Sequence, residues 1–65
     1  MNEIQTLGKL RLGSYFRFIG ENTVFKVGHY ITGTCGYIAC SNQTTKKVTR
    51  VYFDTRVVEV GEPDD

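Results

Sequence analysis

Residues 14–32, SYFRFIGENTVFKVGHYIT, contain two runs of bulky residues on either side of a short polar turn. In the first run, SYFRFIG, bulky side chains alternate until Gly20. The tripeptide ENT follows, and VFKVGHYIT then resumes with β-branched and aromatic residues. Such residues, in alternation and bounded by turn formers, are typical of β-strands. The stretch therefore predicts two consecutive strands.

Three more strands are expected further along the chain. After Gly33, CGYIAC predicts a third strand, SNQTTK a polar loop, KVTRVYF a fourth strand, DT a tight corner and RVVEV a fifth strand. Only residues 2–9 could form a helical turn, and they are too few for a helix that is stable alone. Short strands with closely spaced turns indicate a small barrel or curled sheet. We expect an all-β fold, namely a small five-stranded barrel, whose closure would remove exposed edges.

The chain is short enough for one domain only, residues 1–65, with an N-terminal lead (1–9), the barrel (10–60) and an acidic tail (61–65). A domain of this size buries little surface and is only marginally stable alone. A homo-oligomer is therefore expected, in which outward residues such as Ile19, Tyr30 and Val57 could be buried between copies.

Charge and hydropathy make a cytoplasmic protein with an anionic partner the first expectation, although a mature secreted fragment would look the same. No apolar run approaches the roughly 18 residues of a membrane span, and the first ten residues lack the features of a secretory signal. Residues 1–58 contain eight basic and three acidic residues, a net charge of +5, whereas residues 59–65 contain only acidic charges. A basic body suits an anionic partner, although a solvated surface with a frayed terminus would look the same.

The alternation also separates the two kinds of aromatic residue. Side chains along a strand point to opposite faces in turn. If the core takes Phe16, Phe18, Phe25, Val27, Ile38, Cys40, Val51 and Phe53, then all four phenylalanines are inside. All four tyrosines then point outward with Arg17, Lys26 and Arg50. Phenylalanine can be sealed in a core, whereas the tyrosine hydroxyl needs a partner or water.

The outward set is the candidate ligand-binding site: Tyr15, Arg17, Lys26, Tyr30, Tyr37, Arg50 and Tyr52. Aromatic rings with cations beside them bind bases and phosphates. The alternative stays open that these tyrosines simply pair across strands, for which tyrosine is well suited. Lys46 and Lys47 would border the set from a loop.

Neither a metal site nor a catalytic site is expected from Cys35, Cys40 and His29. A zinc site needs about four ligands, which usually arrive as close pairs. The two cysteines are five residues apart, so on an unbroken strand they point to opposite faces, and this also argues against a disulfide. No nucleophile, base and orienting group are visible together. We therefore expect no enzyme activity and no cofactor, with Cys40 as a small core residue.

Three stretches, KLRLGSYFRFIGENTVFKVG, GYIACSN and TRVYFDTRVVEV, resemble the small SH3-like barrel proteins encoded by bacteriophages. The resemblance covers residues 10–60. It consists of an opening Leu-x-x-Gly-x-x-Phe element (Leu10, Gly13, Phe16), an aromatic-x-Val strand (Phe25, Val27) and a closing Val-Glu-Val strand (58–60). Some small phage proteins of this general kind sequester the cyclic nucleotides of host immunity, and others bind nucleic acid or host proteins.

These observations together predict a non-enzymatic binding module of phage type. The first expectation, implied by the resemblance, is a sponge that holds a nucleotide second messenger, such as a cyclic nucleotide, in the host cytoplasm and so counters host defence. The second is a small nucleic-acid-binding protein. The third is a protein that inhibits a host enzyme through an exposed patch rich in tyrosine and arginine.

Overall fold

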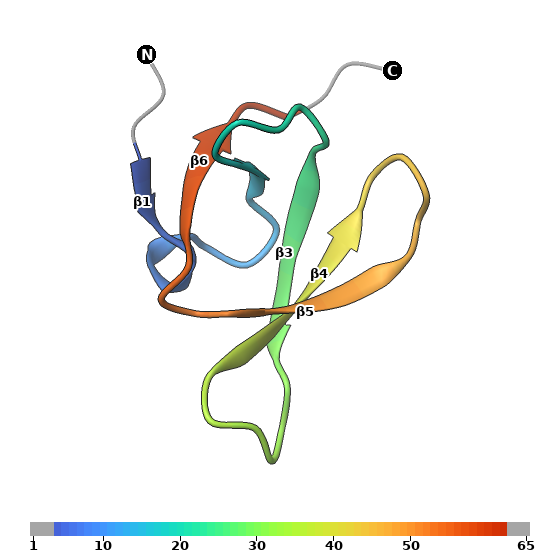
Figure 1. Cartoon of the computed structure of the whole chain (residues 1–65). Helices are drawn as coiled ribbons and strands as arrows, with labels where there is room; N and C mark the ends of the chain where they lie inside the picture. Colours follow the sequence, from blue (N-terminus) through green and yellow to red (C-terminus); the bar gives the residue numbers. More distant parts are fainter. Residues whose placement is uncertain (1–3, 63–65) are drawn as a thin grey trace.

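The computed structural model describes residues 4–62, in which the regular structure is all β apart from one short 3₁₀ turn. The strands are β1 (Ile4–Thr6), β2 (Tyr15–Phe18), β3 (Phe25–Tyr30), β4 (Tyr37–Asn42), β5 (Val48–Tyr52) and β6 (Arg56–Val60), with η1 (Leu7–Lys9) between β1 and β2. They form one antiparallel sheet in the order β1-β6-β2-β3-β4-β5 (Figure 1). The expected all-β class is confirmed. Of the expected lead and acidic tail, residues 1–3 and 63–65 lie outside the described part.

The sheet has six strands, not five, and it is not closed into a barrel. The additional strand is β1, which lies beside β6 with Ile4 opposite Val58. Its three residues are too few to show an alternating pattern, so the sequence indicated only a lead or a helical turn there. β1 and β5 are the edges of the sheet, and Figure 1 shows β5 running crosswise to β6. Backbone bonds join η1 to the turn between β5 and β6, because Leu7 N donates to Thr55 O and Gly8 N to Phe53 O, each at 2.8 Å.

The core lies on the inner face of this curled sheet. It consists of Leu7, Phe16, Phe25, Val27, Ile38, Cys40, Val51 and Val57, with Leu10 and Phe18 packed against it. Phe16 and Phe25 are direct cross-strand partners whose ring centroids are 5.6 Å apart. Phe18 packs edge-on against both. Because β2, β3, β4 and β5 contribute alternate residues, the predicted inward positions on these four strands are confirmed.

Two predicted orientations are wrong at the start and end of strands. Phe53 was expected inside but is 39% exposed, because β5 ends at Tyr52 and Phe53 belongs to the following turn. Val57 was expected outside but is fully buried, because it lies opposite Phe18 on the core side of β6. Val57 therefore cannot contribute to a surface between copies.

A third correction comes from a bulge in β3. The pairing with β4 passes from Val27 opposite Cys40 to Tyr30 opposite Ile38, so two residues of β3 face one residue of β4. Because directly opposite residues share a face, Tyr30 lies on the side of buried Ile38 and not with the other tyrosines. The bulge needs glycine at position 28, since a Cβ there would lie 2.4 Å from the carbonyl oxygen of Ala39.

Candidate functional site

Three exposed aromatic rings gather where β4 begins and β5 ends. Tyr37 and Tyr52 lie directly opposite each other, and their ring centroids are 5.4 Å apart in an edge-on arrangement. The Phe53 ring lies 4.9 Å from that of Tyr52. Each of the three side chains is about two-fifths exposed, at 38%, 42% and 39% respectively. With Arg50 they form the surface called here the aromatic patch.

Two glycines hold the Phe53 ring in place. A Cβ at Gly36 would lie 2.6 Å from Cδ1 of this ring, and a Cβ at Gly8 would lie 3.1 Å from Cδ2. The ring therefore rests against bare backbone at both positions. The main chain is tied as well, because Phe53 N donates to Gly36 O and Gly8 N donates to Phe53 O. The ring is consequently positioned by the fold before any ligand arrives.

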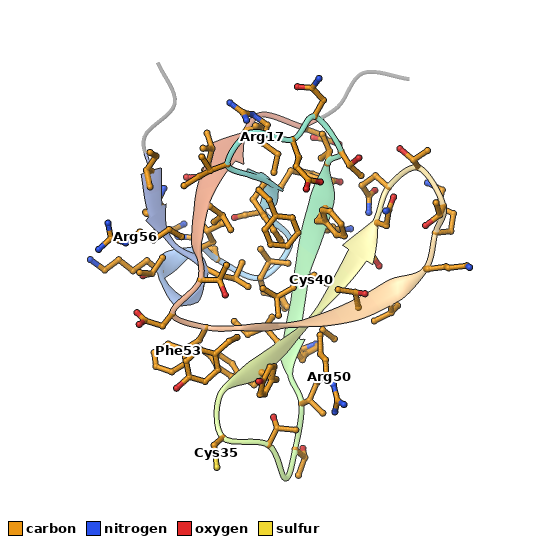
Figure 2. All side chains as sticks on the ribbon, in the orientation of Figure 1. Arg17, Cys35, Cys40, Arg50, Phe53 and Arg56 are labelled. Carbon is orange, nitrogen blue, oxygen red and sulfur yellow. The ribbon has the colours of Figure 1, made fainter. Side chains whose placement is uncertain are left out.

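Arg50 adds a positive charge to the aromatic patch. Its guanidinium carbon lies 5.9 Å from the centroid of the Tyr37 ring, within the range of a cation–π contact. Residues 50 and 52 of β5 point to the same face because side chains alternate along a strand. Figure 2 shows Arg50 and Phe53 in the lower half of the molecule, on either side of the β3–β4 hairpin. A ring for stacking and a cation for a phosphate are thus neighbours.

A second group of predicted residues lies farther along the same face. Tyr15 of β2 is opposite Lys26 of β3, whose ammonium nitrogen lies 5.9 Å from the tyrosine ring centroid. Lys26 is in turn opposite Ser41 of β4, and Ser41 is opposite Val48 of β5. Because directly opposite residues share a face, and Arg50 is two residues after Val48 on β5, Tyr15 and Lys26 lie on the same face as Arg50. Lys46 and Lys47 are exposed in the adjoining loop. That loop is ordered by Asn42 Oδ1, which accepts hydrogen bonds from the backbone N–H of residues 44 and 45.

The structure thus divides the predicted set. Six members share one face by strand alternation: Tyr37, Tyr52 and Arg50 in one group, Tyr15 and Lys26 in a second, and Arg17 two residues after Tyr15 on β2. Arg17 Nη1 donates to Glu21 O at 3.1 Å, and Figure 2 shows this side chain at the opposite end from Arg50. Tyr30 is turned away from the other tyrosines by the bulge, but its hydroxyl lies close to the Phe53 ring, because a Cβ at Gly8 would be 3.2 Å from the one and 3.1 Å from the other. Tyr30 borders a pocket of about 170 Å³ with Leu10, Val27 and Ile38, which is smaller than the roughly 300 Å³ of typical small-molecule sites.

Sequence reasoning missed Phe53, which it assigned to the core. The signal that could have revealed it is the corner DT directly after it, because alternation holds only within a strand. A residue next to a turn has no fixed face until the strand end is known. The aromatic patch therefore contains one ring more than the sequence predicted.

The two cysteines differ in burial. Burial raises the pKa of the Cys40 thiol to about 11, against the smaller opposing effect of a hydrogen bond from the Gly28 backbone. A buried thiol with a raised pKa is a poor nucleophile. Cys35 is exposed. Within residues 4–62, no group of three or more His, Cys, Asp or Glu side chains is placed to hold a metal ion, and no helix is long and apolar enough to cross a membrane.

No model of a known protein family matches the chain. Searches of curated proteins and of solved structures also give no match. The chemistry of the described surface is therefore what indicates a function.

Proposed function

We propose that this chain is a non-enzymatic binding module that holds an anionic, base-bearing ligand on the outer face of its sheet. The observation that carries the proposal is the contact of Arg50 with Tyr37 inside a cluster of three exposed rings. Stacking on an aromatic side chain contributes roughly 1–3 kcal/mol per base, and arginine pairs well with phosphate oxygens.

The order of groups within the aromatic patch suggests how such a ligand lies. Arg50 is next to Tyr37, Tyr37 contacts Tyr52, and Tyr52 contacts Phe53. Asp54 directly follows Phe53, and its carboxylate would repel a phosphate at that end. The phosphate is therefore expected beside Arg50, with a base against the tyrosine rings. Because these rings already contact one another, little ordering cost remains for binding.

A second cation and ring on the same face favour an extended ligand. Lys26 with Tyr15 offers this pair farther along the face of the aromatic patch. A single-stranded nucleic acid could contact both groups. A cyclic nucleotide, the ligand implied by the resemblance to phage proteins, has only a small surface and would need a second wall from another copy of the chain. We place single-stranded nucleic acid first and the second-messenger sponge second.

The SH3-like character of the fold is part of the same proposal. The five strands β6-β2-β3-β4-β5 are contiguous in the sheet order and enclose one core, with β1 added at an edge. The backbone bonds from η1 to Phe53 and Thr55 support a partly closed form. A five-stranded SH3-like unit extended by β1 would account for these features.

Calorimetry at two salt concentrations tests the proposed ligand. A short single-stranded oligonucleotide should bind with an affinity that falls with salt, by a log–log slope of about −0.7 per phosphate contact. Cyclic di- and trinucleotides should give a shallower slope, because they carry few phosphates. Heat only from a cyclic nucleotide would favour the sponge, and no heat from either ligand class would refute the proposal and leave the inhibition of a host protein.

Matched variants locate the binding surface. Arg50→Gln removes the charge beside Tyr37 and should weaken oligonucleotide binding about tenfold, the size of a charge-assisted hydrogen bond. Arg11→Gln removes the same charge from an exposed residue outside the aromatic patch and should change the affinity less than twofold. Equal losses for both variants would mean that net charge, and not the aromatic patch, attracts the ligand.

A further inference from the structure

A second polar site lies at the other edge of the sheet, where β1 pairs with β6. An open pocket of about 380 Å³ is lined there by Ile4, Gln5, Thr6, Lys9 and Arg56. It shares no residue with the aromatic patch. Two of its lining side chains are cations, two are neutral hydrogen-bonding groups, and no acidic side chain lines it among the residues that the structure describes.

The backbone brings the polar groups of this pocket together. Thr6 and Arg56 are direct cross-strand partners, so their side chains leave the sheet on the same face with Cβ atoms about 5 Å apart. Lys9 comes from η1, which is anchored by the fully buried Leu7 and by its backbone bond to Thr55 O. The hydroxyl, the guanidinium and the ammonium therefore belong to segments that are fixed to one another.

Two acidic side chains in the described part of the chain, Glu59 and Asp54, come near the pocket but do not line it. Glu59 Oε1 accepts a hydrogen bond from Gln5 Nε2 at 3.1 Å, and Glu59 is not part of the pocket lining. Asp54, two residues before Arg56, does not line it either. Figure 2 shows Arg56 projecting from the β1–β6 edge, well away from Arg50. The two cations thus create a positive potential in a pocket that offers mainly hydrogen-bond donors.

We propose that this pocket binds the phosphate group of a phosphorylated molecule. Arg56 can donate two parallel hydrogen bonds to phosphate oxygens, Lys9 supplies a second positive charge, and the Thr6 hydroxyl can donate to a third oxygen. The volume exceeds that of a phosphate alone and falls within the range of small-molecule sites, so it leaves room for an attached sugar. The phosphate comes either from a small sugar phosphate or from the end of a nucleic-acid strand. This inference does not depend on the function of the aromatic patch.

Titration of the isotope-labelled full chain with inorganic phosphate, followed by amide chemical shifts, tests the site. Saturable shifts are expected at residues 6, 9 and 56, against a sodium chloride titration at equal ionic strength. Arg56→Gln and Lys9→Gln should each weaken the phosphate affinity about tenfold, and the spectrum itself reports whether each variant is folded. Arg11→Gln is the matched control, because this exposed arginine lies outside the pocket and outside the aromatic patch, and it should change the affinity less than twofold.

Three further ligands identify the source of the phosphate. Tighter binding of ribose 5-phosphate than of inorganic phosphate supports a small sugar phosphate, whereas tighter binding of a 5′-phosphorylated trinucleotide than of its 5′-hydroxyl form supports a strand end. If neither binds more tightly than inorganic phosphate, the pocket does not hold an attached group and that part of the inference is wrong. Equal shifts with chloride, or an equal loss in Arg11→Gln, would overturn the site altogether.

Discussion

Replacement of Gly36 by alanine should disturb both the stability of the chain and the aromatic patch. The backbone at Gly36 has φ +107°, a conformation that costs a residue with a side chain roughly 1–3 kcal/mol. The new Cβ would also lie 2.6 Å from Cδ1 and 3.0 Å from Cε1 of Phe53, so the ring must move. Overpacking of this kind costs typically about 1–3 kcal/mol more.

Gly33→Ala provides the control, because Gly33 also has a positive φ, +86°, but a Cβ there would meet nothing within 4 Å. Only the backbone cost applies at this position. We therefore expect Gly36→Ala to be less stable than Gly33→Ala by about 1–3 kcal/mol, the size of the overpacking cost alone. In urea titrations with a slope of about 1 kcal/mol/M, this difference lowers the unfolding midpoint by about 1–3 M.

A double-mutant cycle assigns the difference to the ring. In a Phe53→Ala background no ring opposes the new methyl group, so Gly36→Ala and Gly33→Ala should destabilise the chain by similar amounts. The same background keeps the test informative if Gly36→Ala alone does not fold. Equal midpoints for Gly33→Ala and Gly36→Ala with Phe53 present would refute the reasoning that Phe53 is seated on Gly36.

Three other predictions follow from burial and size. Phe16→Ala should lower the free energy of unfolding by about 3–5 kcal/mol in a denaturant titration, because Phe16 is fully buried. Tyr37→Ala should lower it much less, and equal losses would contradict the assignment of faces. Burial raises the pKa of the Cys40 thiol from 9.0 to about 11, so as the pH rises the thiol loses its proton in the unfolded chain before it does so in the folded chain. The contribution of this thiol to the free energy of unfolding should therefore be fully present below pH 9 and should be lost as the pH rises toward 11. A Cys40→Ala variant that shows the same decline would refute this cause. Light scattering at micromolar concentration should give the mass of an oligomer, since a 65-residue chain is near the limit of stability alone, and a monomer mass would reject this expectation.

The alternation of residues along the chain by itself determined the all-β class and most of the core. Phe16, Phe25 and Ile38 were placed inside because the two-residue period of a strand is a local property that needs no knowledge of pairing. The same period placed Tyr37, Tyr52 and Arg50 on one outer face, where they lie together. The candidate site was predictable to this extent because cross-strand neighbours on one face follow from strand order.

The tertiary structure alone decided what depends on where strands begin, end and pair. Phe53 joins the aromatic patch because β5 stops one residue earlier, and Tyr30 approaches only Phe53 and not the other tyrosines because a bulge shifts the pairing of β3 with β4. β1 is a strand only because β6 lies beside it, and the pocket of Lys9 and Arg56 exists only because that pairing joins residues about 50 positions apart. Alternation within one strand carries no information on such contacts, since they arise from hydrogen bonds and packing between distant segments that form only when the whole sheet assembles.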